Sequence, residues 1–292
     1  MALIVEQFEQ RFARHQRQMA IRATLGWLIF LAALSGAIAI SHIDPGVLAQ
    51  GIGKLTDFVR LMLPHLDAAH LFAGKKTVGS LAYWFYDFPK WLGLIWQSVE
   101  IAILATCLGF IGALGWSFPA ARNLQMPKRI TFVVRRFLEL CRTVPELVTA
   151  LIFVFAFGPG PLAGVLAIAI HTTGALGKLY SEVHENAQPG PIEGIKAAGA
   201  SWSKVVRFGV VPQVMPNLVS YALLRFEVNV AASTAIGIVG AGGIGLQLRQ
   251  AIDLNVPQDA LAMIVMIIVL IFLIDLTSER VRTLFMRGQL VS

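Results

Sequence analysis

Polar side chains interrupt an otherwise apolar stretch around residue 225. Tyr221, Arg225 and Asn229 follow one another four residues apart, so a helix places them on one stripe, whereas Glu227 points elsewhere. Charges in an apolar helix are costly and must face protein or water. Either Arg225 lines a route for an anion, or an Arg–Glu pair holds helices or subunits together. We favour the ion pair, because a channel that binds its anion too strongly does not release it.

A second polar segment, residues 193–212, lies between two apolar stretches of membrane-spanning length. The prolines of Pro189-Gly190-Pro191 prevent the preceding helix from continuing. Glu193 then falls in the first turn of a new helix, where a carboxylate favours the positive end of the helix dipole. One face of that helix would carry a small apolar patch able to enter a partner's groove, formed by Ile192, Ile195 and Ala198.

The rest of this segment predicts a stop and a second helix. Gly199 suits a helix end, and Val205, Val206 and Phe208 begin a short amphipathic helix that ends before Pro212. The alternative is an ordinary helix lying on the membrane surface. We favour docking of a partner, with these contacting residues: Glu193, Gly194, Ile195, Ala197, Ala198, Gly199 and Pro212.

The elements that must position these residues are membrane helices. The chain has 292 residues, of which 56% are hydrophobic and only 14% are charged, far from the composition of a soluble domain. No alternating strand pattern occurs, and in hydrocarbon a helix satisfies its own backbone. We therefore predict an all-α, polytopic fold with about six spans, at residues 25–40, 91–118, 132–157, 162–180, 218–239 and 260–276.

The third of these spans is doubtful. Arg135, Arg136, Glu139 and Arg142 would place four charges along its first half, and Pro145 then interrupts the helix. We expect an amphipathic segment to about Arg142, a break near Pro145 and a short helix over 146–157.

Basic residues near the span ends predict the topology. The two tails, the 2–3 connection and the 4–5 connection are rich in Lys and Arg and would all be cytoplasmic. The turn at 158–161 and the 5–6 connection would lie outside. The connection after span one has nearly balanced charge, which leaves its side undecided. We expect the first 24 residues to be retained as a cytoplasmic amphipathic helix rather than removed as a signal peptide.

Composition also narrows the partners. The net charge of +7 resides mainly in tails and loops, so lipid headgroups explain it without nucleic acid. Cys107 and Cys141 have no metal-ligand spacing, and no cofactor is implied. No nucleophile–base pair and no Walker loop occur, so we expect neither catalysis nor ATP hydrolysis by this chain. The glycine-rich run 240–245 follows a membrane helix rather than a strand, which argues against nucleotide binding and favours close packing.

The segment 193–212 resembles the "EAA" loop of ABC importer permeases, in which an acid, a glycine six residues later and a proline recur. Gly194 and Ile195 stand where that family often has two alanines, and Gly209 where it often has isoleucine. The surrounding residues look like the permease of phosphonate ABC importers, in segments 142–147, 174–182, 225–229 and 239–245 together with Tyr221. Methionine importers share the proline and the glycine-rich run but not the 225–229 cluster.

The resemblance implies a type I importer permease of the bacterial inner membrane, with both termini cytoplasmic. Residues 1–90 would precede a permease core over 91–292, whose coupling loop spans about 181–215. Implied partners are two copies of an ATPase, an extracytoplasmic phosphonate-binding protein and a second permease copy forming a homodimer. The transported solute would be phosphonate or a related phosphorus oxyanion; the alternative is methionine or another small solute.

A secondary transporter is the main rival class, since Glu139, Glu146 and Glu227 lie in or beside predicted spans. His171 could relay protons, but its predicted span offers no acidic partner at helical spacing, and we favour a structural histidine. A membrane enzyme is disfavoured because paired catalytic groups are missing. The segment 193–212 discriminates among these classes, because neither rival needs it.

Overall fold

The computed structural model describes residues 2–41 and 44–287, in which helices are connected by turns and no strand occurs. The chain divides into two compact units at residues 61 and 62. The first unit contains α1 (Ala2–Ile40) and most of α2 (Pro45–Met62). The expected N-terminal amphipathic segment and first span form one continuous helix, and its part over Arg14–Ile40 is long and apolar enough to cross a membrane.

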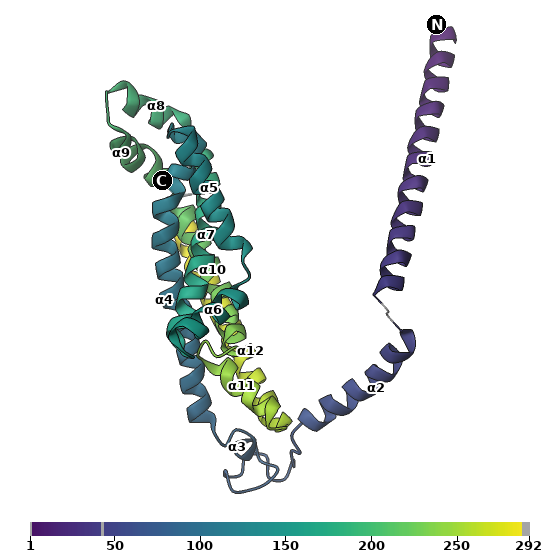
Figure 1. Ribbon diagram of the computed structural model, residues 1–292, viewed down its shortest axis with the longest axis vertical. Helices are drawn as coiled ribbons and strands as arrows, with labels where there is room; N and C mark the ends of the chain where they lie inside the picture. The colour runs from purple at the N-terminus through teal and green to yellow at the C-terminus, as the bar shows by residue number, and fades with distance from the viewer. Residues whose placement is uncertain (1, 42–43, 288–292) are drawn as a thin grey trace. The chain divides into compact units, whose positions relative to one another are not determined.

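The second unit is a bundle of long helices with short ones at its two ends (Figure 1). In chain order its elements are α3 (Leu81–Trp84), α4 (Phe88–Ala120), the 3₁₀ turn η1 (Arg122–Leu124), α5 (Lys128–Thr143), α6 (Glu146–Phe157), α7 (Pro161–Glu185), α8 (Pro189–Ala197), α9 (Trp202–Lys204), the π-helical η2 (Val205–Val210), α10 (Val211–Gly237), α11 (Ile244–Asp253) and α12 (Pro257–Arg287).

Within the described residues, four helices are long and apolar enough to span a membrane, or five if the bent pair α5 and α6 counts as one span. These correspond to expected spans one, two, three, four and six. The fifth expected span is α10, which carries Arg225, Glu227 and Asn229 and is not among the helices that meet the criterion. Its crossing of the membrane therefore stays a prediction.

The expected break in the third span is confirmed. α5 ends at Thr143, α6 begins at Glu146, and the two helices meet at an angle of 85°. Proline lacks a backbone donor and disfavours helical geometry in the residue before it, which explains why Val144 is extended. α5 is accordingly amphipathic, with Val134, Arg135 and Leu138 on its buried side.

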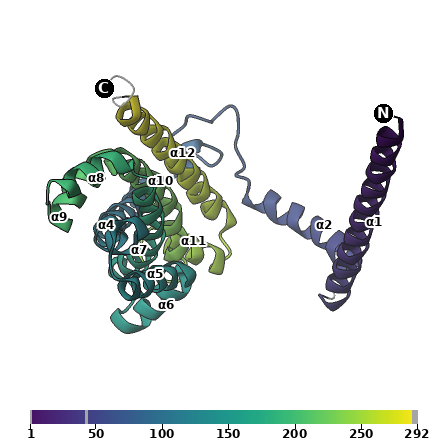
Figure 2. The same ribbon diagram turned by 90° about the horizontal axis from the view of Figure 1, so that it is seen from above.

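Helix α7 lies in the middle of the bundle and packs against α4, α5, α6 and α10 (Figure 2). Small residues allow this close approach. A Cβ added to Gly109 would lie 2.4 Å from Thr172 Cγ2, and one added to Gly174 would lie 2.7 Å from the backbone nitrogen of Arg142. α4 and α5 therefore contact α7 at a distance that larger side chains would prevent.

The glycine-rich run forms the tight turn between α10 and α11. Gly240, Gly242 and Gly243 all have positive φ angles. The backbone nitrogens of Gly243 and Ile244 donate to Gln97 Oε1 and Ser98 Oγ of α4, at 2.9 and 3.1 Å. No strand precedes the run within the described residues, so it has the packing role expected for it and lacks the strand that a nucleotide-binding loop requires.

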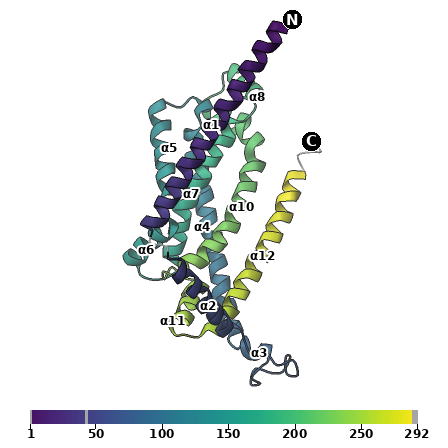
Figure 3. The same cartoon turned by 90° about the vertical axis from the view of Figure 1, so that its right-hand side faces the viewer.

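The connections of the second unit gather at two opposite ends (Figures 1 and 3). At one end, which we call the glycine-turn end, Gly160 donates to the Gly240 carbonyl at 2.9 Å. The connection before α4 joins this end, since Trp84 Nε1 donates to the Gln258 carbonyl at 2.9 Å. The turn at 158–161, the connection between the fifth and sixth expected spans and residues 62–87 therefore lie at one end. The charge of the connection after the first span did not predict its side, whereas these contacts group its residues 62–87 with the glycine-turn end.

The opposite end, which we call the elbow end, collects the 2–3 and 4–5 connections. Asn123 Nδ2 donates to the His184 carbonyl at 2.7 Å, and the backbone nitrogen of Arg122 donates to Glu185 Oε1 at 2.8 Å. Trp202 Nε1 donates to the Leu124 carbonyl at 2.9 Å. The two connections predicted to be cytoplasmic from their basic residues are thus bonded to each other.

Candidate functional site

The predicted docking segment forms an elbow, which we define as residues 189–204: α8, a turn and α9. α7 ends at Glu185 and α8 begins at Pro189, as the prolines predicted. α8 ends in a Schellman motif, in which Gly199 (φ +77°) donates to the Lys196 carbonyl and Ala200 to the Ile195 carbonyl, at 2.9 and 3.3 Å. The expected helix stop at Gly199 is confirmed.

The prediction for Glu193 was wrong in one respect. Because α8 already begins at Pro189, Glu193 lies in its second turn and not in its first. Its carboxylate is exposed on the surface of the elbow. Most of the other predicted contacting residues are exposed too, namely Gly194, Ala197, Ala198, Gly199 and Pro212, whereas Ile195 is half-buried.

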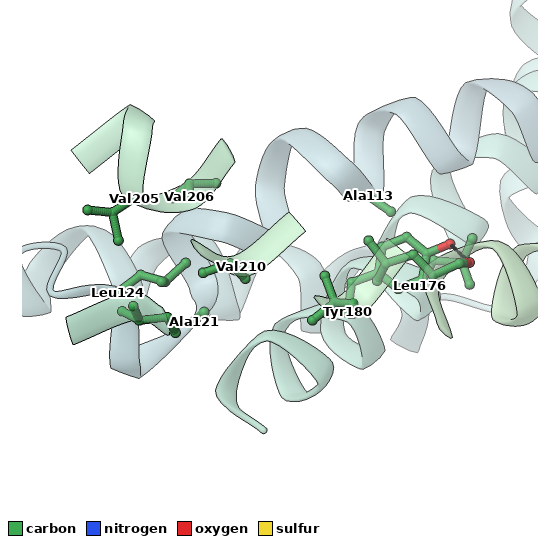
Figure 4. Close-up of a cluster of buried hydrophobic side chains, with 11 residues drawn as sticks. Ala113, Ala121, Leu124, Leu176, Tyr180, Val205, Val206 and Val210 are labelled. Carbon is green, nitrogen blue, oxygen red and sulfur yellow. Dashed lines mark hydrogen bonds between the residues drawn. The ribbon is translucent and has the colours of Figure 1, made fainter. Parts of the chain in front are cut away.

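Two of the three residues of the predicted apolar docking face, Ile192 and Ile195, are covered by the chain itself, whereas Ala198 is exposed. Ile192 is buried, with an exposed fraction of 6%, in a cluster that includes Val205, Val206 and Val210, and Ile195 packs against the same cluster (Figure 4). α8 is amphipathic as predicted, but its apolar side faces η2 rather than a partner. The surface left for a partner is the opposite one, which carries Glu193.

The second helix of the segment was also predicted incorrectly. It does not end before Pro212, because α9, η2 and α10 follow one another without a break. Pro212 follows π-helical η2 directly, and the helical run continues through it into α10. The elbow is therefore joined directly to the helix that carries Arg225.

Beneath the elbow, a polar cluster joins α4, α5 and α7. Arg135 of α5 forms an ion pair with Glu185, and its Nε donates to the Ala120 carbonyl at 2.8 Å. His184 is fully buried: its ring stacks on Phe118 at 4.5 Å, and Nε2 lies 3.0 Å from Ser117 Oγ. These contacts give the elbow a rigid base.

The second predicted site lies inside the bundle, around Arg225. Arg225 Nη2 lies 2.6 Å from Glu146 Oε1, in the first turn of α6. His171 Nε2 lies 3.4 Å from the same oxygen. The exposed fractions of the three side chains are only 15%, 17% and 19%. Charge-assisted bonds of this kind are about twice as strong as neutral ones, so the carboxylate links α6, α7 and α10.

Asn229 extends this site into the core. Its Nδ2 lies 2.8 Å from Thr106 Oγ1 and 3.0 Å from Thr172 Oγ1. Arg225 Nε in turn lies 3.4 Å from Thr172 Oγ1. Thr172 and Asn229 are fully buried. The predicted stripe therefore brings Arg225 and Asn229 into one network that spans α4, α7 and α10.

The structure separates the other two predicted residues from this network. Tyr221 lines a hollow of about 520 Å³ near the elbow, together with Asn186, Gln188 and Asn217. Glu227 faces α12, where Asp275 and Arg282 lie. Arg225 is thus in an ion pair, and its partner is Glu146 of α6 rather than Glu227.

The pairing of Arg225 with Glu146 was not predicted from the sequence. Glu146 is 79 residues from Arg225 along the chain, and no helical spacing connects residues on different helices. The signal that was available is that each is a charge beside apolar residues, and such charges pair with one another. His171 was interpreted as a structural histidine because its own predicted span offers no acidic partner at helical spacing; its acidic neighbour is on α6.

Comparisons with known proteins agree with this architecture. The family model "Binding-protein-dependent transport system inner membrane component" matches residues 105–288. The chain is 35% identical over 225 residues to the phosphite transport system permease protein PtxC of Stutzerimonas stutzeri, covering 75% of this chain and 82% of that protein. It is 51% identical over 121 residues to the putative cryptic phosphonate transport system permease protein PhnE2 of Escherichia coli, covering 41% of this chain and 99% of that protein.

A solved structure has the same fold. The inward-facing MetNI methionine ABC transporter superposes with a TM-score of 0.58 at 20% identity, over 67% of this chain and 95% of that one. The expected all-α fold of a type I ABC importer permease is confirmed. The chain belongs to the family of inner membrane components of binding-protein-dependent transport systems.

Proposed function

We propose that this chain forms the channel of an ATP-driven importer that moves phosphonate, phosphite or a related phosphorus oxyanion across the bacterial inner membrane. The relatives named for phosphite and phosphonate transport support the substrate class. The energy comes from a separate ATPase subunit, two copies of which serve two copies of this chain. A soluble binding protein delivers the solute from outside.

The exposed elbow carries this proposal. A membrane channel has no need of an ordered helix–turn–helix beyond its spans unless a partner binds there. Glu193 and Ala197 are exposed on α8, and the elbow is fixed to the bundle from beneath through Ile192 and Trp202. A force applied to the exposed side would therefore reach the channel.

The orientation follows from the same proposal. The elbow end lies in the cytoplasm, where the ATPases are, together with both termini. The glycine-turn end faces outward and receives the binding protein. The grouping of basic connections at the elbow end supports this arrangement. Residues 91–292 form the permease core of the proposed subunit.

Reversing the charge at Glu193 tests the coupling. In Glu193→Lys we expect the ATPase to be lost on purification of the permease, and phosphite-dependent growth and uptake to be lost with it. Glu279→Lys makes the same change at an exposed residue of α12 and should leave both intact. ATPase that stays bound in Glu193→Lys at the wild-type ratio would contradict the docking role. Accumulation of phosphite by vesicles that contain this chain alone would contradict the ATP-driven function itself.

A further inference from the structure

We propose that the cluster of Arg225, His171 and Glu146 is an oxyanion site occupied by the chain's own carboxylate. In this conformation Glu146 binds the same Arg225 and His171 side chains that bind the phosphorus oxyanion during transport. This inference rests on the proposed function and adds to it a binding site for the solute inside the bundle.

The donors converge on a single oxygen atom. Arg225 Nη2 and His171 Nε2 approach Glu146 Oε1 from two different helices, at 2.6 and 3.4 Å. The other ring nitrogen of His171 lies 3.4 Å from the Val144 carbonyl. The guanidinium donates to this oxygen, and the imidazole does so when its Nε2 carries a proton, so the pair accepts a phosphorus oxyanion as readily as a carboxylate.

Arg225 is held in place by groups other than Glu146. Its Nε lies 3.4 Å from Thr172 Oγ1, which also bonds to Asn229 at 3.0 Å. Asn229 is anchored a second time by Thr106, at 2.8 Å. Among the described residues, Glu146 is the single carboxylate within ion-pairing distance of Arg225. Departure of Glu146 would leave the guanidinium positioned and without a counter-ion.

Glu146 stands at the start of a short helix, directly after a break in the chain. It follows the break at Val144 and Pro145, where α5 and α6 meet at 85°. α6 has only 12 residues, and Ala150 is its single buried one. Rotation about the break would withdraw the carboxylate, while α7 and α10 stay joined to each other through the network around Asn229.

A resident carboxylate also answers the objection to an anion route through Arg225. A site that holds its anion tightly does not release it. A competing carboxylate on the same chain acts at an effective concentration of about millimolar or more, so it lowers the net affinity for the solute. Glu146 would then expel the oxyanion each time α6 returns, and the solute would leave without a separate step.

Direct binding of phosphite and methylphosphonate tests the proposal. The permease is purified in lipid nanodiscs as the complex it forms, and binding is measured without nucleotide or binding protein. In Glu146→Gln we expect both anions to bind about tenfold tighter or more, a difference of about 1.4 kcal/mol, because the competing charge is gone. Adding Arg225→Gln to this variant should abolish the gain.

Two further variants make the test specific. Asp253→Asn removes the carboxylate from Arg249, another arginine ion pair, and should leave oxyanion binding unchanged. Glu146→Asp keeps the charge on a shorter side chain and should raise the affinity a few-fold. Unchanged affinity in both Glu146 variants, or failure of both to assemble, would overturn the oxyanion site. If either result is obtained and the wild-type permease still takes up phosphite, the proposed function is not contradicted.

Discussion

The Arg225–Glu146 pair lowers the free-energy cost of placing the Arg225 charge inside the bundle. An arginine at the centre of a membrane helix costs about 2.5–3.5 kcal/mol on insertion scales. Here a carboxylate 2.6 Å away and the hydroxyl of Thr172 offset that cost. The charge is tolerated because three helices meet around it. It was recognisable in the sequence as an anomaly, whereas its partner could be identified only in three dimensions.

Tyr86 provides a pH-dependent test at the glycine-turn end. Its hydroxyl donates to Asp259 Oδ2 at 2.8 Å. Partial burial, reinforced by that bond, raises the pKa of Tyr86 to about 12. Tyrosine in an unfolded chain has a pKa of about 10. Because the folded pKa is the higher one, the stabilisation is complete below about pH 10 and is lost as the pH rises toward 12.

We therefore expect Tyr86→Phe to lower the free energy of unfolding by about 1 kcal/mol at pH 8, and the difference from wild type to shrink as the pH rises from about 10 toward 12. Unfolding temperatures measured in detergent across this range check it. Tyr83→Phe removes a hydroxyl from the same connection and serves as the control. A constant difference at every pH would contradict the role of the Tyr86–Asp259 bond.

At the scale of elements, two exposed glycines of the elbow, Gly194 and Gly199, allow the effect of backbone geometry to be tested separately from the effect of side-chain contact. A Cβ added to Gly194 or Gly199 would meet nothing within 4 Å. Gly194 is helical, whereas Gly199 has a φ of +77°. Alanine at Gly199 should cost about 1–2 kcal/mol of backbone strain, while alanine at Gly194 should stabilise α8 by up to about 1 kcal/mol.

We accordingly expect Gly199→Ala to weaken retention of the ATPase and to slow uptake, and Gly194→Ala to leave both at or above the wild-type level. The amount of ATPase retained on the purified permease is the measurement. Equal behaviour of the two variants would mean that the bend at the end of α8 is not needed for docking.

Local chemistry explains which elements were predictable. Pro145 and the Pro189-Gly190-Pro191 run act on their own backbone, so the break and the start of α8 could be located from sequence. Gly199 likewise marked its own helix end. Pro212 did not end a helix, because the helical run of η2 continues through it into α10. The sequence pattern could not reveal that valines of η2 cover the apolar side of α8.

The same division holds for the interior site. Arg225 and Asn229 lie one helical turn apart, so their shared stripe was predictable. Tyr221 lies one turn earlier, yet the structure places it beside the hollow near the elbow. Glu146 and His171 join the site from other helices, at separations that no periodicity describes. Residues on one helix were thus predicted together, and contacts between helices were not.

At the scale of the whole molecule, the two ends of the second unit should lie on opposite sides of the membrane. In a variant in which both native cysteines, Cys107 and Cys141, are replaced by serine, a single cysteine at Gly194 or at Val78 reports each end. Val78 is 70% exposed at the glycine-turn end. An impermeant maleimide should label Val78→Cys in intact spheroplasts, and Gly194→Cys only after permeabilisation. Labelling of Gly194→Cys in intact spheroplasts would place the elbow outside.

The unbroken run of helix from Trp202 to Gly237 has a mechanical consequence. Val205 and Arg225 are about 30 Å apart along this rod, at 1.5 Å per residue. Pro216 removes one backbone donor, yet the helix continues through it. No slack backbone lies between the two points, so tilting the rod at its base shifts the guanidinium relative to Glu146 on α6. A single tilt of the rod would then both transmit the movement of the proposed ATPase to the channel and exchange the anion bound to Arg225.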